Sequence, residues 1–221
     1  MSTHFLVTGS GKCGTHFLQA VLVELGLAVA HEGVLAYEPV TAPAWGPYRG
    51  DCSWPAAMHL QTLEPGTPVL HLVRDPLAVL NARYGENKLN DSFPYPLFRA
   101  FVRRHLPNVF DDTHDDLGRN ILFVEGWNRH LERTPERCPL LPYRRVRVED
   151  VSADPELLRT VVGFLAGRPP SLDACRAALK TVGTQTGRGR DHAALTWADV
   201  RAHPNGAGLV RLALDYGYDA A

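Results

Sequence analysis

The chain has 221 residues, a formal net charge of -1 at pH 7 and a hydrophobic content of 45%. This length and composition are typical of one globular domain covering residues 1–221, and they exclude an intrinsically disordered chain. The near-neutral charge provides no overall basic field, so we expect no nucleic-acid partner.

The cysteines and the apolar segments indicate the cellular setting. Cys13, Cys52, Cys138 and Cys175 lack the spacing of metal ligands, and no secretory signal precedes them, so we expect reduced thiols and a cytoplasmic location. The longest apolar stretch, residues 20–30, is shorter than the roughly 20 residues of a transmembrane helix. We therefore expect neither a membrane span nor a metal site.

A strand, a glycine-rich loop and a helix are predicted at the beginning of the chain. Phe5 to Val7 is a short apolar run, glycines follow from Gly9 to Gly14, and apolar residues at helical spacing begin at Phe17. Such a loop points backbone N–H groups and the positive end of a helix dipole at one place, where a phosphate binds. A turn that binds nothing is the simpler alternative.

The loop differs from that of ATP-binding proteins. It keeps two glycines, Gly9 and Gly14, with four residues between them, but Thr15 and His16 follow Gly14 where GxxxxGK[ST] has a lysine and a hydroxyl for Mg²⁺. Lys12 lies inside the loop instead. The pattern favours a 5′-phosphate carrying one transferable anionic group, with an ATP-dependent phosphotransferase of the P-loop type as the alternative.

Lys12-Cys13-Gly14-Thr15 resembles the 5′-phosphosulfate loop of the PAPS-dependent sulfotransferases, which usually reads Lys or Arg, Ser, Gly, Thr, Thr. Cys13 and His16 depart from that pattern. The resemblance, to the bacterial P-loop-type members, implies PAPS (3′-phosphoadenosine 5′-phosphosulfate) as co-substrate and PAP as product. It implies nucleotide contacts from Gly11, Lys12, Cys13, Gly14, Thr15, His16 and Phe17, the last near the adenine.

A second short strand is predicted at residues 27–30, with His31 and Glu32 at its carboxyl end, where open parallel sheets bind ligands. The resemblance extends here, since many bacterial sulfotransferases carry a Gly-His-Glu-like element, although Ala30 replaces the glycine. It implies Glu32 as the general base, with His31 or His16 as alternatives. A solvated carboxylate in a loop is the simpler interpretation.

Residues 33–53 show no period and contain several aromatic and proline residues, so we expect an irregular segment. One interpretation is that it lines an acceptor pocket, and the other is that its aromatic residues form a small satellite core. Residues 84–101 are a second candidate for the acceptor wall. Ser53, which precedes Trp54-Pro55, is predicted to cap a helix.

A continuous apolar strand, residues 69–73, ends in Arg74-Asp75-Pro76 and passes into a helix. An arginine at a strand end is suited to bidentate phosphate binding, and Arg-Asp-Pro resembles the 3′-phosphate motif of the family. A salt bridge to a neighbouring acid is the structural alternative. The family places a serine where this chain has Ala82, and Asn81 or Arg83 is the candidate to replace that contact.

The later elements are mainly structural. We expect helices near 96–105, 117–133 and 157–166, the last capped by Asp154 and Pro155, and a strand at 145–148 that leads into Glu149. Arg188 and Arg190 lie where the resemblance places a late basic loop, which implies 3′-phosphate contacts. A surface loop is the alternative.

These patterns predict an α/β fold of three layers, α/β/α, with a mainly parallel sheet. The predicted function is transfer of the sulfuryl group of PAPS to a hydroxyl or amine of a small-molecule or carbohydrate acceptor, without a metal. Lys12 would stabilise the charge that develops on the bridging oxygen. A catalytically degenerate PAP-binding module is the non-enzymatic alternative, supported by Ala82.

Overall fold

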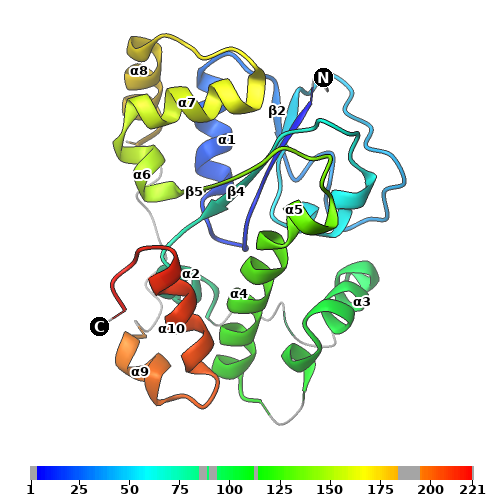
Figure 1. Cartoon of the computed structure of the whole chain (residues 1–221), viewed down its shortest axis with the longest axis vertical. Coiled ribbons are helices and arrows are strands. Elements are labelled where there is room, and N and C mark those ends of the chain that lie inside the picture. The colour runs from blue at the N-terminus through cyan, green and yellow to red at the C-terminus, as the bar shows by residue number, and fades with distance from the viewer. Residues whose placement is uncertain (1–3, 85–88, 90–93, 112–113, 184–194, 221) are drawn as a thin grey trace.

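The computed structural model describes residues 4–84, 89, 94–111, 114–183 and 195–220. Its centre is a five-stranded sheet with the order β2-β3-β1-β4-β5, in which every neighbouring pair of strands is parallel (Figure 1). The strands are β1 (Phe5–Thr8), β2 (Val29–His31), β3 (Gly50–Cys52), β4 (Val69–Val73) and β5 (Tyr143–Arg147).

Helices cover both faces of this sheet. One face packs against α1 (Thr15–Glu24), α6 (Val148–Ala153), α7 (Pro155–Ala166) and α8 (Leu172–Gly183). The other face packs against η1 (Pro55–Thr62), α2 (Pro76–Arg83), α3 (Pro96–His105), η3 (Pro107–Phe110), α4 (Asp116–Glu132), α9 (Trp197–Ala202) and α10 (Gly206–Asp215). The short α5 (Thr134–Arg137) follows α4.

The protein has two hydrophobic cores, one on each face of the sheet, and successive side chains of the buried strands point alternately into them. Phe5 of β1 and Leu70 of β4 belong to the core beneath α1 and α7, whereas Leu6 and Val69 belong to the core beneath α4 and α10. Successive side chains of a strand point to opposite faces, so a strand buried on both sides separates two cores. The predicted three-layer α/β/α architecture with a parallel sheet is confirmed.

The segment 33–53 was expected to be irregular throughout, and this is wrong at its end. Gly50–Cys52 forms β3, which lies between β2 and β1. A side chain at Gly50 would overlap the ring of Phe5, so the approach of β3 to β1 requires glycine there. Ser53 is also not a helix cap, because its Oγ donates to the carbonyl oxygen of Leu35 and η1 starts after Trp54.

The other predicted elements are confirmed with small shifts. β2 starts two residues later than expected, and β5 ends at Arg147 because Val148 begins α6. The helix at 96–105 matches α3, and the helix at 117–133 corresponds to α4. Asp154 caps α7 as expected, since its carboxylate accepts a hydrogen bond from the Glu156 N–H at 2.9 Å.

The topology defines where a ligand is expected. From β1 the chain passes through α1 toward β2 on one side of the sheet, whereas from β4 it passes through α2 and α4 toward β5 on the other side. The connections that leave β1 and β4 therefore run in opposite directions. In open α/β sheets, ligands bind at the carboxyl ends of the two strands where the direction changes in this way. Lys12 follows β1 and Arg74 follows β4.

Candidate functional site

The loop after β1 has the conformation of an anion cradle. Gly14 lies immediately before α1 with φ 102°, a left-handed conformation that glycine adopts without strain. The Trp127 indole N–H of α4 donates to the Gly9 carbonyl oxygen at 3.0 Å, and the Cys13 N–H donates to the Ser10 carbonyl oxygen at 3.0 Å. The beginning of α1 is thereby held at the sheet edge.

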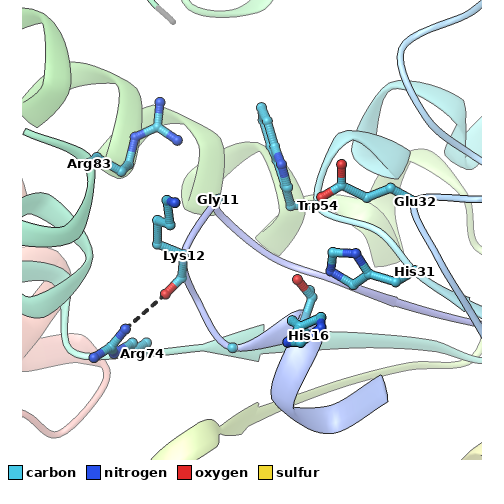
Figure 2. Close-up of a pocket in the computed structure, with 10 residues that line it drawn as sticks. Gly11, Lys12, His16, His31, Glu32, Trp54, Arg74 and Arg83 are labelled. Atoms are coloured by element: carbon cyan, nitrogen blue, oxygen red, sulfur yellow. Dashed lines mark hydrogen bonds between the residues drawn. The ribbon is translucent and has the colours of Figure 1, made fainter. Parts of the chain in front are cut away.

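The loops after four strands meet in one pocket of about 280 Å³ (Figure 2). The loop after β1, the end of β2 with the residue that follows it, and the loops after β3 and β4 each contribute, together with the last residue of α2. The lining residues are Gly11, Lys12, Gly14, Thr15, His16, His31, Glu32, Trp54, Arg74 and Arg83. Side chains of both signs, which lie as far apart in the sequence as Lys12 and Arg83, thus face a single cavity.

Arg74 and Lys12 are connected directly. Arg74 Nη1 donates a hydrogen bond to the backbone carbonyl oxygen of Lys12 at 3.2 Å, which Figure 2 shows as a dashed line. This bond leaves the Lys12 ammonium directed away from Arg74, toward the end of the pocket that holds Trp54 and Arg83. The two cationic side chains therefore serve opposite ends of the same pocket.

The candidate bases lie across the pocket from Lys12. The rings of His16 and His31 meet edge to face with their centroids 5.1 Å apart, and Figure 2 shows the Glu32 carboxylate directed toward Trp54. Burial, followed by the charge of His16, lowers the pKa of His31, while the Asp51 carboxylate opposes this shift. His31 is therefore neutral at pH 7 and able to accept a proton.

The turn that carries Glu32 is anchored from beneath by Asp51 of β3. The Asp51 carboxylate accepts hydrogen bonds from the N–H groups of Gly33, Val34 and Leu35 at 3.4, 3.1 and 2.7 Å. Burial raises the pKa of Asp51, and these three amides oppose the shift. Asp51, a fully buried acid that no sequence pattern identifies, therefore holds the turn on which Glu32, the candidate base, lies.

A second cavity of about 490 Å³ adjoins the first through Gly14 and Arg74. It is lined by Gly14, Phe17, Arg74, Val148, Glu149, Ser152, Leu179 and Gly183. Phe17, predicted from the resemblance to lie near an adenine, faces this second cavity. The two cavities together offer a mixed aromatic, aliphatic and cationic surface on both sides of the loop.

Glu149 connects Asp75, the residue after Arg74, to Tyr218 near the C-terminus. Its carboxylate accepts hydrogen bonds from the Asp75 N–H at 3.2 Å and from the Tyr218 hydroxyl at 2.6 Å. These bonds support the structural role expected for the strand that leads into Glu149. Asp75 in turn caps α2 by accepting from the Leu77 N–H at 3.0 Å.

Several predicted contacts lie elsewhere. The Cys13 side chain is fully buried in the core, where burial raises the pKa of its thiol to about 12, and the pocket lining does not include Cys13 or Ala82. Asn81 exchanges two hydrogen bonds with the backbone of Leu195, at 3.0 and 2.7 Å, and so holds that segment. Arg188 and Arg190 lie outside the described residues.

The structure adds two residues to the site. Trp54 follows β3, whereas the sequence pattern places it only at the start of a helix. For Arg83 the sequence predicts only a replacement for a missing serine contact. Both line the pocket, and Arg83 is 1% exposed. Position at the end of a strand is a signal that would have found Trp54 had β3 been recognised.

No protein-family model matches the chain, and a search among curated proteins finds no match. Among solved structures, the chain is similar to mouse sulfotransferase SULT7A1 complexed with PAP. The two are 14% identical with a TM-score of 0.46, and the similarity covers 98% of this chain and 79% of the mouse chain.

Two further properties bear on the site. Within the described ranges, no three His, Cys, Asp or Glu side chains are placed together so that they could hold a metal ion. Within the same ranges, no helix has the length and apolar character needed to cross a bilayer.

Proposed function

We propose that this chain is a sulfotransferase that uses PAPS and transfers its sulfuryl group to a hydroxyl or amine of a small-molecule or carbohydrate acceptor. The observation that carries the proposal is that Lys12, Arg74 and Glu32 line one pocket although they follow three different strands. A lysine inside a phosphate-type loop, an arginine at a neighbouring strand end and an opposed carboxylate supply the charges that sulfuryl transfer needs.

The residues fit the nucleotide in their chemistry. Gly14 tolerates the left-handed conformation that lets the backbone approach a phosphate, and Thr15 offers a hydroxyl at the beginning of α1. Lys12 and Thr15 would hold the 5′-phosphate, and Arg74 the 3′-phosphate. The aromatic ring of Phe17, in the adjoining cavity, is suited to stack on a base.

PAPS supplies the sulfuryl group, whose bond to a 5′-phosphate oxygen breaks as its bond to the acceptor oxygen or nitrogen forms, leaving PAP. Lys12 stabilises the negative charge that collects on the bridging phosphate oxygen, an interaction stronger in the transition state than in the ground state. Glu32 accepts the proton that the acceptor loses and then releases it to solvent. His31 is the alternative proton acceptor.

The decisive experiment is calorimetric titration with PAP and, separately, with ATP and Mg²⁺. We expect PAP to bind and ATP with Mg²⁺ to bind about tenfold more weakly, because Thr15 and His16 follow Gly14 in place of a lysine and then a hydroxyl residue. Lys12→Met should lower transfer from PAPS on the order of 100-fold. Lys180→Met, a matched change on the exposed surface of α8, should leave transfer unchanged.

Different results would point to the alternatives. Tighter binding of ATP with Mg²⁺ than of PAP would indicate a phosphotransferase. Binding of PAP without transfer to a broad panel of phenols, alcohols, amines and sugars would indicate a nucleotide-binding module. Near-normal transfer by Lys12→Met would show that the lysine does not have the assigned role.

A further inference from the structure

Arg83 is the most buried cationic side chain of the pocket. It occupies the last turn of α2 and is 1% exposed, yet it lines the cavity beside Lys12. Figure 2 shows its guanidinium near the tip of the Lys12 side chain, at the end of the pocket opposite Arg74. Arg74 and Arg83 therefore lie on two sides of Lys12.

The surroundings hold the guanidinium in a defined place. Its central carbon lies 4.2 Å from the ring centroid of Phe123 and 5.9 Å from that of Trp54, so aromatic faces stabilise the charge. A Cβ atom added at Gly11 would lie 2.6 Å from Arg83 Nη1. The absence of a side chain at position 11 thus makes the space that brings Arg83 against the loop.

A buried guanidinium beside an ammonium creates strong local affinity for an oxyanion. Removing a cation from water is costly, and its attraction to an anion increases as the surroundings become less polar. The planar fork of arginine contacts two oxygens of one tetrahedral group, which a lysine does not do. The end of the pocket that holds Arg83 also holds Trp54, toward which the Glu32 carboxylate is directed.

We infer that Arg83 is a further catalytic residue, whose guanidinium binds the oxygens of the transferred sulfuryl group while Lys12 neutralises the bridging oxygen. Arg74 then serves the 3′-phosphate alone. The inference rests on the proposed function, and it assigns Arg83 to the transferred group rather than to the nucleotide. Arg83 gives up no proton and forms no covalent bond, so the bonds that form and break in the transfer are those of the proposed reaction.

The experiment compares Arg83→Gln with Arg83→Lys and with Arg159→Gln, an exposed arginine of α7 that serves as the control. Inorganic sulfate is titrated calorimetrically into the PAP-bound and the nucleotide-free protein, and PAP affinity is measured in parallel. We expect Arg83→Gln to weaken sulfate binding about tenfold or more and PAP binding less than about threefold. Arg83→Lys should give an intermediate loss of sulfate affinity, and Arg159→Gln none.

Gly11→Ala provides a second route to the same result. It leaves the arginine in the chain but displaces Nη1, so sulfate binding should weaken while circular dichroism shows an intact fold. This variant keeps the test decisive if Arg83→Gln fails to fold.

Three outcomes would overturn the assignment: unchanged sulfate affinity in Arg83→Gln, an equal loss of PAP affinity, or no sulfate binding to the wild type. An equal loss of PAP affinity would place Arg83 on the nucleotide phosphate. Failure of the proposed function has a different signature, since wild-type protein would then not bind PAP. The assignment of Arg83 to a transferred sulfuryl group would fall with it, and the sulfate titration of the nucleotide-free protein would then report only whether Arg83 binds an oxyanion.

Discussion

Lys12 and Glu32, assigned here to leaving-group stabilisation and proton transfer, share an uncommon backbone conformation. Their φ angles are 74° and 53°, in the left-handed region that few residues with a side chain adopt. Such a conformation costs on the order of 1–2 kcal/mol and persists where the surroundings enforce it, often at functional sites. Both residues lie in loops that follow strands, and both line the pocket.

The proton-transfer role is tested by comparing Glu32→Gln with His31→Gln. Because the amide cannot accept a proton, Glu32→Gln should lower turnover with PAPS on the order of 100-fold while PAP affinity changes little. His31→Gln should lower turnover less than about tenfold. Steady-state kinetics and PAP calorimetry measure both quantities, and a larger loss in His31→Gln would transfer the role to the histidine.

At the scale of elements, the short strand β3 organises the turn after β2. Asp51→Asn replaces one carboxylate oxygen with an amide nitrogen that faces backbone N–H donors, so we expect a loss of about 2 kcal/mol in unfolding free energy. Hydrogen exchange of the amides at 33–35 should increase, and turnover should fall because the Glu32 turn loosens.

Urea unfolding and amide exchange provide the measurements for this variant. Asp173→Asn, at a side chain that is 92% exposed, is the control and should change stability by less than about 0.5 kcal/mol. Unchanged exchange at 33–35 in Asp51→Asn would show that the carboxylate does not hold the turn.

The same element shows what the sequence reveals and what it does not. The apolar runs before Gly9 and before Arg74 are long enough to identify strands, so the meeting of Lys12 and Arg74 at one sheet edge was predictable. Gly50-Asp51-Cys52 carries no such pattern, because its glycine is required by the ring of Phe5 and its acid by the neighbouring turn. Only tertiary packing reveals that strand, and with it Trp54.

The sequence names Arg83 as a candidate contact, but it does not predict that its guanidinium lies against the loop after β1. The helical pattern after Arg74 predicts α2, but it does not show which end of the helix reaches the pocket. That depends on Phe123 of α4 and on Gly11, which are distant in the sequence.

At the scale of the whole molecule, His71 links the sheet to its helical layer. Its ring nitrogens lie 2.7 Å from the Tyr143 hydroxyl and 3.0 Å from Asn128 Oδ1, and complete burial lowers the pKa of His71 to about 4. The unfolded chain takes up this proton near pH 6.5 and the folded protein does not until about pH 4. Acid therefore favours unfolding across that window.

We expect the unfolding free energy to fall by on the order of 3 kcal/mol through His71 alone as the pH decreases from about 6.5 to about 4, with no contribution above that range. Urea unfolding across this range measures the slope. His71→Gln should make the unfolding free energy depend less steeply on pH in this range. An unchanged pH dependence in this variant would show that His71 is not responsible for the loss of stability.

The two cavities that share Gly14 and Arg74 have a consequence for chemical probes of this protein. Weak fragments that occupy the two cavities separately would both contact this shared wall. A short rigid tether between them would make the second contact intramolecular, so affinity would rise through effective concentration without additional contacts. Inhibitor discovery can therefore begin with two ligands of low affinity, one for each cavity, and link them past Gly14.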